Sequence, residues 1–345
     1  MADYVGMGAQ LAGNALRFGW FSTVNWLMDR ESARLGHRPR YKPMRPVPSR
    51  EEMFAELRKL LVADAALVRD GVLPPASDEP GGLREHLSRL RAMIADLPES
   101  VGRREAEDTR SATKLADPTG LPEYFTQDFH FQTGGYLSED SARLYDVQVE
   151  TLFYGSAAAM RRAALMPIAE YMRARDQRYV SLVDVACGTG RFLRQVRLAY
   201  PAMRLKGLDL SSSYVREAER HLDGLRPVDW LTANAESIPL QNASQDIVTT
   251  VFLFHELPPE VRRTVAAEMA RVLKPGGLLV FVDSLQMGDK PGWDGLLEAF
   301  PVRFHEPYYR QYAIDDLDGM FSGVGLEPVS TDLAFMSKVM TRRKS

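Results

Sequence analysis

The sequence contains a single cysteine, Cys187, among 345 residues. One cysteine excludes an internal disulfide framework and a zinc site built on several thiolates, and no metal site is predicted. The lack of disulfides is typical of a reducing compartment, so we expect a cytoplasmic protein. Basic residues show no surplus, because 43 Lys and Arg stand against 46 Asp and Glu. Since nucleic-acid binders carry a clustered basic excess, no nucleic-acid partner is expected.

Long apolar runs are scarce as well, and the strongest lies between residues 5 and 28, with Arg17 as its only charge. Gln10, Asn14 and four glycines interrupt it, which argues against a spanning helix of about 20 apolar residues. A basic tract follows at residues 37–43. Two interpretations stay open. The segment is either an interfacial helix whose cations face anionic lipids, or a helix packed on the protein itself or across a homodimer interface, which we favour.

The chain start also lacks the features of a secretory signal. Met1-Ala2-Asp3 has no basic residue, and no clear small-residue cleavage site follows the apolar stretch. We therefore predict that this start is not a secretory signal.

The first 118 residues predict a small helical region without a catalytic motif. A capping box at residues 49–52 opens one helix, and apolar residues follow it at helical spacing. A second amphipathic stretch over residues 83–97 is expected to end at Pro98. Residues 99–118 are charged and poor in apolar side chains, which indicates a linker.

From residue 180 onward, short β-rich runs alternate with helical patterns. The predicted strands are residues 180–185, 205–210, 228–232, 247–253 and 278–282. Ahead of them, Ser138 has the character of a helix N-cap, and one helix is expected from Ser156 toward Arg175. The alternation predicts an α/β fold in which helices cover both faces of a parallel sheet.

A turn of small residues, Val183-Asp184-Val185-Ala186-Cys187-Gly188-Thr189-Gly190, joins the first strand to its helix. Small residues let the backbone approach a cofactor, and the helix N-terminus offers free amides. Asp209 closes the second strand, where its carboxylate can accept both ribose hydroxyls. Strand, turn and acid together predict an adenosine site. A nicotinamide cofactor is disfavoured, because Arg191 replaces the third glycine of its fingerprint.

Residues 183–193 resemble motif I of class I methyltransferases, particularly the small-molecule branch that includes ubiquinone and menaquinone methyltransferases. Residues 233–240 are similar to the adenine-contacting loop of that family, with Asn234 where most members have Asp. Residues 252–257 and 271–277 resemble its later motifs. The resemblance implies S-adenosylmethionine as the cofactor and a doubly wound, mostly parallel seven-stranded sheet. It also implies that an antiparallel hairpin over residues 326–335 and 338–341 ends this sheet. It assigns this domain, preceded by a lid segment, to residues 119–345, after the N-terminal helical region and linker of residues 1–118.

The resemblance also implies which residues bind the cofactor. These are Asp184, Ala186, Gly188, Gly190, Asp209, Leu210, Asn234, Ala235 and Phe252. Ala186 departs from the pattern, which often has its first glycine there. Arg143 and Tyr145 either hold the carboxylate of the cofactor or are solvated helix residues.

Methyl transfer requires alignment of the acceptor and exclusion of water, and a base only if the acceptor loses a proton. His255 follows the fourth strand and either contacts the acceptor, serves as a base, or is held by local hydrogen bonds. His305 and Tyr309 lie where related enzymes build the acceptor pocket. His130 lies in an aromatic segment similar to one that covers the active site of lipid methyltransferases, or in an ordinary packed cluster.

These features together predict a methyltransferase for a small, apolar acceptor such as a quinone, an isoprenoid, a sterol-like molecule or a fatty lipid. A polar metabolite or a phenolic natural product is the alternative acceptor. The other classes that stay open are a catalytically silent methyltransferase-like scaffold and an NAD-dependent oxidoreductase.

Overall fold

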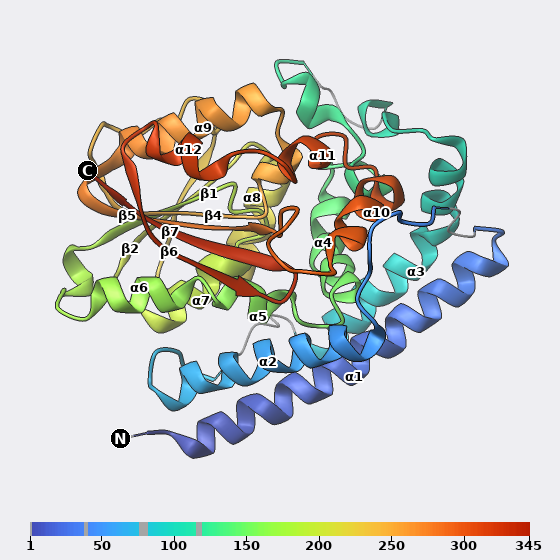
Figure 1. Cartoon of the computed structure of the whole chain (residues 1–345), viewed down its shortest axis with the longest axis horizontal. Coiled ribbons are helices and arrows are strands. Elements are labelled where there is room, and N and C mark those ends of the chain that lie inside the picture. Colours follow the sequence, from blue (N-terminus) through green and yellow to red (C-terminus); the bar gives the residue numbers. More distant parts are fainter. Residues whose placement is uncertain (1, 38–40, 76–81, 115–118) are drawn as a thin grey trace.

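A computed structural model of the chain describes residues 2–37, 41–75, 82–114 and 119–345 (Figure 1). Part of the predicted basic tract, residues 38–40, and the predicted domain boundary at residue 118 lie outside the described residues. The first helices are α1 (Tyr4–Arg34), α2 (Arg50–Arg69) and α3 (Gly82–Ala106), followed by the short helix η1 (Ser111–Lys114). The predicted capping box opens α2, because Ser49 accepts from the Glu52 amide and Glu52 reaches back to Ser49.

The course of α3 corrects one prediction. We expected a helix end at Pro98, but α3 continues through this proline to Ala106, so the predicted linker is helical over its first residues. Met93, Leu97 and Val101 form one buried stripe across the proline. Burial of that stripe outweighs the cost of about 3 kcal/mol that proline imposes inside a helix.

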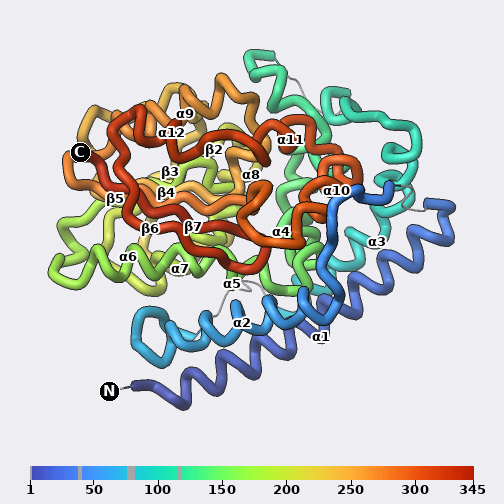
Figure 2. The backbone as a smooth tube through the Cα atoms, viewed as in Figure 1, coloured from blue at the N-terminus to red at the C-terminus, as the bar shows by residue number. Residues whose placement is uncertain are grey.

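Two polar residues of α1, Gln10 and Asn14, face the protein interior. Gln10 and Asn14 are buried and donate to Oδ2 of Asp64 on α2, at 2.8 and 3.0 Å. Asp64 in turn forms a buried ion pair with Arg162 of α5, with Nε to Oδ1 at 2.5 Å. Figure 2 shows α1 and α2 side by side below the sheet. The favoured interpretation of residues 5–28, packing on the protein itself, therefore holds for this face of the helix.

Within the described ranges, no helix is both long enough and apolar enough to cross a bilayer.

Among the described residues, seven strands form a single sheet in the order β3-β2-β1-β4-β5-β7-β6. They are β1 (Ser181–Val185), β2 (Arg204–Asp209), β3 (Asp229–Thr232), β4 (Gln245–Val251), β5 (Leu273–Ser284), β6 (Leu326–Ala334) and β7 (Ser337–Lys344). Strands β1 to β5 pair in parallel, and β7 lies antiparallel between β5 and β6. The predicted fold class, the strand positions and the closing hairpin are confirmed.

Alternate residues of the strands feed two hydrophobic cores, one on each face of the sheet. Leu182, Ile247 and Leu278 pack with residues of α2, α6 and α7, whereas Val183 and Val248 pack with α9 and α12 (Figure 1). The remaining helices are α4 (Glu139–Leu152), α5 (Ala157–Arg162), α6 (Leu165–Met172), α7 (Arg191–Ala199), α8 (Ser212–His221), α9 (Pro259–Val272), α10 (Asp294–Phe304), α11 (Tyr309–Tyr312) and α12 (Leu317–Ser322), with short helices η2 (Glu123–Thr126), η3 (Phe129–Phe131), η4 (Gln177–Tyr179) and η5 (Phe254–Glu256). The sheet is therefore doubly wound.

One predicted helix is divided. The stretch from Ser156 toward Arg175 forms α5 and α6 instead of a single helix. Pro167 explains the break, because it has no amide to donate to Ala163 and its ring crowds that carbonyl. Ser138 caps α4 as predicted, accepting from the amide of Ser141 at 3.1 Å.

Candidate active site

A pocket opens at the carboxyl ends of β1, β2 and β4, where the strand order reverses direction. Eight of the nine predicted cofactor residues line it, namely Asp184, Ala186, Gly188, Asp209, Leu210, Asn234, Ala235 and Phe252. The ninth, Gly190, is the N-cap of α7 directly beside the pocket. We call this space the cofactor pocket.

The two glycines of the turn serve different purposes. Both have left-handed backbones, with φ of +54° at Gly188 and +73° at Gly190. A Cβ on Gly188 would meet no described atom within 4 Å, because it would extend into open space. A Cβ on Gly190 would lie 2.9 Å from the Cβ of Ala218, so this glycine lets α7 approach α8. Ala186 adopts φ of +58°, which accounts for the glycine that the pattern often has there.

Asp209 ends β2 with its carboxylate fixed by the backbone. Oδ2 accepts from the Gly188 amide at 2.8 Å, and Oδ1 accepts from the Ser211 amide at 2.9 Å. Burial raises the pKa of Asp209 to about 6, against these hydrogen bonds, so the group is ionised at neutral pH. Each carboxylate oxygen keeps a further lone pair for a ligand hydroxyl.

Two more polar side chains of the pocket are held in place. Asp184 accepts from the Thr249 hydroxyl at 2.6 Å, and burial raises its pKa to about 7. Asn234 accepts from the Glu236 amide at 2.9 Å and donates to the Glu236 carboxylate at 3.0 Å. The amide orientation of Asn234 is therefore set before any ligand binds. Open space beside Gly188, a buried carboxylate on β2 and this fixed amide fit an adenosyl cofactor.

A second, largely apolar pocket adjoins the first one, and we call it the acceptor pocket. It shares Tyr145, Phe252 and Glu256 with the cofactor pocket. Its other lining residues are His130, Val149, Leu152, Phe153, His255, Ser284, Leu296, Leu297, Phe300, Tyr309 and Met336. The structure thus brings three predicted site residues, His130, His255 and Tyr309, to one cavity.

His255 is held by a carboxylate at the end of β5. Its Nδ1 lies 2.6 Å from Oδ1 of Asp283. The Oδ1 atom also accepts from the amide of Ser284, and Oδ2 accepts from the amide of Phe254, each at 2.7 Å. Burial alone would lower the pKa of His255, but the charge and hydrogen bond of Asp283 outweigh it and raise the pKa to about 10. The sequence leaves a local hydrogen bond of His255 and a position of His255 in the acceptor pocket as alternatives, but the structure contains both.

The other predicted residues differ in position. Tyr309 shares a hydrogen bond of 2.6 Å with the hydroxyl of Ser284. His130 packs edge-on against Phe300, and burial lowers its pKa to about 3, so its imidazole is neutral. His305 is not among the described residues that line the two pockets. Its Nε2 lies 3.1 Å from Oε1 of Gln127.

Residues 182–277 match the family model described as a methyltransferase domain. The chain contains a methyltransferase domain. The predicted family and its cofactor, S-adenosylmethionine, are thereby confirmed for the class I domain.

Known relatives resemble parts of the chain. Over 99 residues it is 37% identical to malonyl-[acyl-carrier protein] O-methyltransferase from Hahella chejuensis, covering 29% of this chain and 34% of that protein. Over 150 residues it is 32% identical to demethylmenaquinone methyltransferase from Listeria welshimeri, covering 40% of this chain and 62% of that protein. A solved S-adenosylmethionine-dependent methyltransferase from Aquifex aeolicus is 16% identical, with coverages of 53% and 93% and a TM-score of 0.38. The chain spans less than two thirds of the length of the first two relatives.

One residue of the cofactor pocket was not among the predicted site residues. Arg143 was suggested for the carboxylate of the cofactor, but it bonds to Glu85 and Ser88 on α3, at 3.3 and 2.6 Å. Arg161, from α5, lines the cofactor pocket together with Tyr145, the second residue suggested for this role. Which of two arginines on neighbouring helices faces a pocket is decided by helix packing, which the sequence pattern does not reveal.

Two carboxylates beside the pockets were not predicted either. Glu256 lines both pockets, and burial raises its pKa. Glu306 is buried beside it, and burial raises its pKa well above the usual range. Each directly follows a predicted histidine, His255 or His305. That adjacency was the available signal, although carboxylates in loops are mostly solvated.

Proposed function

We propose that the chain is an S-adenosylmethionine-dependent methyltransferase that acts on a small, apolar acceptor. The observation that carries this proposal is the meeting of the two pockets at Tyr145, Phe252 and Glu256. When bound, S-adenosylmethionine supplies a methyl group already activated on a sulfonium. The protein then has to align the acceptor with that methyl group and exclude water.

Three residues of the cofactor pocket would divide the recognition of the cofactor. Asp209 would accept the ribose hydroxyls on its remaining lone pairs, and Asn234 would contact the adenine. Arg161 lines the same pocket and would pair with the carboxylate of the methionyl part.

The walls of the acceptor pocket favour an apolar molecule. Leu296, Leu297 and Phe300 from α10 face Val149 and Leu152 from α4, and polar groups are few. Pockets of this composition bind ligands mainly through apolar burial. A quinone, an isoprenoid, a sterol-like molecule or a fatty lipid meets this requirement. The Listeria relative is named for a demethylated menaquinone, which is an acceptor of this kind.

Two segments, which we call the lid segments, close over the site: residues 123–131 and residues 305–309. His305 and Tyr308 contact Gln127, at 3.1 and 3.5 Å, and so join the two segments. His130 and His305 have left-handed backbones, with φ of +58° and +45°. Such strained residues concentrate at ligand-covering segments. The lid segments support the exclusion of water that methyl transfer needs.

A third pocket offers an approach to the acceptor pocket between the N-terminal helices. It is lined by Met28 of α1, Met93 and Leu97 of α3, and further residues of α4. It shares His130, Tyr145, Val149 and Leu152 with the acceptor pocket. We infer that the N-terminal helical region forms the entrance for the acceptor.

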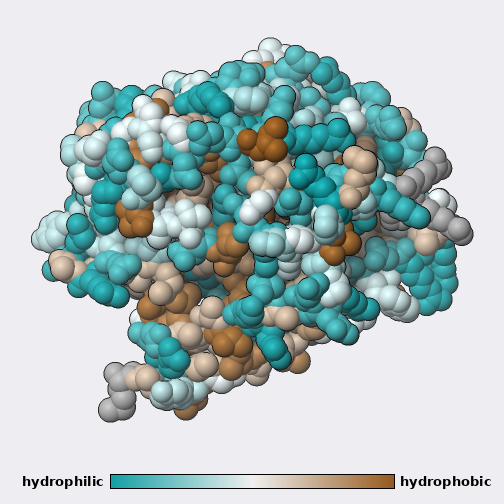
Figure 3. All heavy atoms as spheres, viewed as in Figure 1, coloured by the Kyte–Doolittle hydropathy of each residue, from teal (hydrophilic) through white to brown (hydrophobic). Residues whose placement is uncertain are grey.

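The outer face of α1 is the surface that we assign to lipid contact. Leu16 and Trp26 are 76% and 57% exposed, and Val5 is exposed near the helix start. Apolar atoms gather in the lower part of Figure 3, over α1 and α2, while hydrophilic atoms dominate the rest of that face. Arg30 and Arg34 follow on the same helix as cations for anionic head groups. An apolar acceptor stored in a membrane would reach the entrance from this side.

Calorimetry and a labelled transfer assay test the proposed function. Asp209→Ala should weaken S-adenosylmethionine binding by about 1–3 kcal/mol, the scale for loss of charge-assisted hydrogen bonds. Asp229→Ala is the control, because this exposed carboxylate on β3 contacts only Lys206 among the described residues. Incubation with methyl-labelled cofactor and a lipid extract of the source cells should move label into the organic phase. Unchanged affinity in Asp209→Ala refutes the cofactor assignment, and binding without transfer to any extract favours a silent scaffold.

A further inference from the structure

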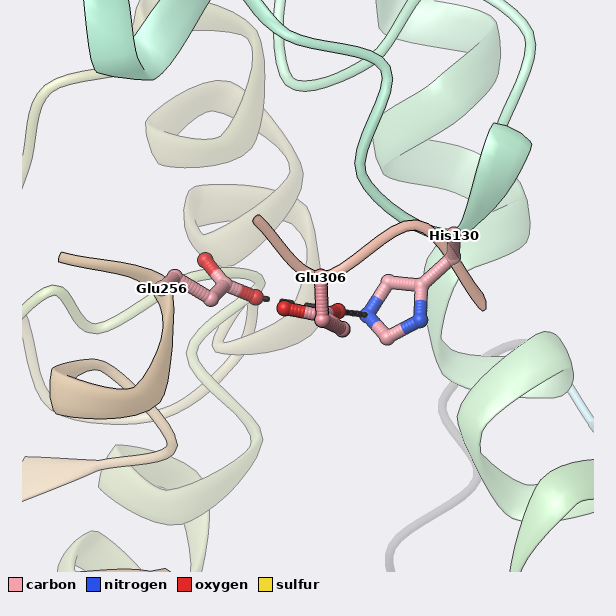
Figure 4. Close-up of side chains that lie close together, drawn as sticks. All are labelled: His130, Glu256 and Glu306. Carbon is pink, nitrogen blue, oxygen red and sulfur yellow. Dashed lines mark ion pairs between the residues drawn. The ribbon is translucent and has the colours of Figure 1, made fainter. Parts of the chain in front are cut away.

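Three side chains from distant segments meet in the wall between the cofactor pocket and the acceptor pocket. They are His130 of η3, Glu256 of η5 and Glu306 in the loop before α11. One ligand atom of each lies within 4.8 Å of those of the other two. Nε2 of His130 is 3.1 Å from Oε1 of Glu306 and 4.0 Å from Oε1 of Glu256. Figure 4 shows the three side chains converging, with Glu306 between the other two.

Glu306 is the member that requires an explanation. Its side chain is 0% exposed, yet neither carboxylate oxygen accepts a hydrogen bond from any residue within the described ranges. Burial of a carboxylate without compensating hydrogen bonds is costly, and an uncompensated charge costs several kcal/mol. The nearby carboxylate of Glu256 adds like-charge repulsion when both groups are ionised. A cation held between the two carboxylates would remove both costs.

Neighbouring side chains hold Glu256 and His130 in position. The Tyr136 hydroxyl donates to Oε1 of Glu256 at 2.5 Å. The His130 ring lies edge-on to Phe300 and Phe304, with ring centres 6.2 Å apart in each case. Fixed carboxylates and fixed imidazoles are typical of metal sites, where such contacts hold the ligands in position.

We propose that His130, Glu256 and Glu306 bind one divalent transition-metal ion. Three protein ligands leave a coordination position open, as in catalytic rather than structural sites. The imidazole favours zinc, iron, cobalt or manganese over calcium and magnesium, which prefer oxygen ligands alone. Sequence analysis predicted no metal site, because no spacing motif connects three residues that only the packing of the lid segments brings together.

The place of the site determines what the open position faces. His130 and Glu256 line the acceptor pocket, and Glu256 also lines the cofactor pocket. The ion would therefore coordinate an oxygen of the acceptor and hold it toward the cofactor, a consequence that rests on the proposed function. Metal binding itself does not rest on it.

The test uses the full chain without cofactor or acceptor, so its result is independent of methyl transfer. Protein stripped with a chelator is dialysed against Zn²⁺, Mn²⁺ or Co²⁺ separately, and bound metal is measured by mass spectrometry. We expect about one ion per chain, and a rise in Tm with metal as expected for binding to the folded state. His130→Gln and Glu306→Gln should reduce bound metal to background.

His37→Gln is the matched control, because His37 also lies beside a carboxylate, with Nδ1 2.5 Å from Oε1 of Glu105, but outside the cluster. It should bind as much metal as the natural chain. Spin-echo spectroscopy of the natural chain loaded with Mn²⁺ should detect a nitrogen bound directly to the ion. This measurement does not depend on the folding of any variant. Three results would overturn the proposal: no bound metal with any of the three ions, no nitrogen signal, or full metal binding by both cluster variants. The two carboxylates would then share a proton instead of a metal ion.

Discussion

Nδ1 of His255 lies 2.6 Å from Oδ1 of Asp283, a carboxylate that is 0% exposed at the end of β5. The same carboxylate accepts from the amides of Phe254 and Ser284. Asp283 therefore fixes both the imidazole and the loop that carries it. This arrangement presents His255 to the acceptor pocket in one orientation.

Asp283→Asn should impair methyl transfer more than cofactor binding. The asparagine keeps the size of the side chain but removes the charge that orients His255, and loss of such a supporting carboxylate typically costs about 10–100-fold in activity. We expect kcat to fall by this factor while the Kd for S-adenosylmethionine stays unchanged. Asp289→Asn is the control, because Asp289 pairs with Lys338 and is not among the described lining residues of either pocket. A kcat equal to that of the natural chain would show that His255 needs no such orientation.

Alanine at the two glycines of the cofactor turn should have opposite main effects. At Gly188 the methyl group would extend into open space, so Gly188→Ala should fold with a loss of about 1–2 kcal/mol from its left-handed backbone. Its affinity for S-adenosylmethionine should drop at least about tenfold, equivalent to 1.4 kcal/mol. At Gly190 the methyl group would meet Ala218 at 2.9 Å, which adds about 1–3 kcal/mol of overpacking.

Thermal unfolding and calorimetry of the two glycine variants separate these effects. Gly190→Ala should have the lower Tm, and Gly188→Ala the weaker binding relative to its stability. Natural affinity in Gly188→Ala would mean that the open space beside this residue is not the cofactor site.

The strands and the cofactor turn were predictable because their signals are local. A buried parallel strand is a short apolar run, and an adenosyl site needs small residues and an acid at fixed places along the chain. Gly188 and Asp209 satisfy these needs within two consecutive βα units. The end of α3 was not predictable in the same way. Whether Pro98 ends a helix depends on whether Val101 beyond it finds a buried place, which is a property of the packed structure.

The acceptor side could be predicted only in part. His130, His255 and Tyr309 were selected from aromatic and strand-end patterns, and the structure brings them to one cavity. Glu306 gave only the weak signal of its adjacency to His305, because its burial is a property of the packed structure. The roles of these residues stay predictions that the variants above test.

Stability should fall as the pH rises through the titration of Asp184. Burial raises the pKa of this carboxyl to about 7 in the folded chain, against 3.8 for an exposed aspartate. Between about pH 4 and pH 7 the folded state holds a proton that the unfolded state has released. Unfolding is therefore favoured progressively as the pH rises across this window, and the loss persists above pH 7.

Asp184→Asn removes this titration and keeps an oxygen for the Thr249 hydroxyl. Relative to the natural chain, the variant should gain on the order of 1–3 kcal/mol between pH 5 and pH 8 in the absence of cofactor. Differential scanning calorimetry across that range measures the gain. Parallel Tm curves for the two proteins would show that Asp184 is ionised throughout.

The exposed apolar face of α1 should bind lipid vesicles. Leu16 and Trp26 protrude from a helix whose opposite face is fixed to α2 through Asp64. Sedimentation should pellet the natural chain with anionic vesicles more than with neutral ones, because the basic tract of residues 37–43 adds attraction. Leu16→Ser with Trp26→Ser removes two side chains worth about 1.5–3 kcal/mol each when buried, so partitioning should fall more than about tenfold.

Val329→Ser is the matched control for this vesicle assay, since Val329 is 55% exposed on the outer strand β6. It should pellet like the natural chain. A different outcome would be that the natural chain pellets with neither vesicle type and forms a dimer in analytical ultracentrifugation. If the double variant is then monomeric, the same face of α1 joins two copies of the chain.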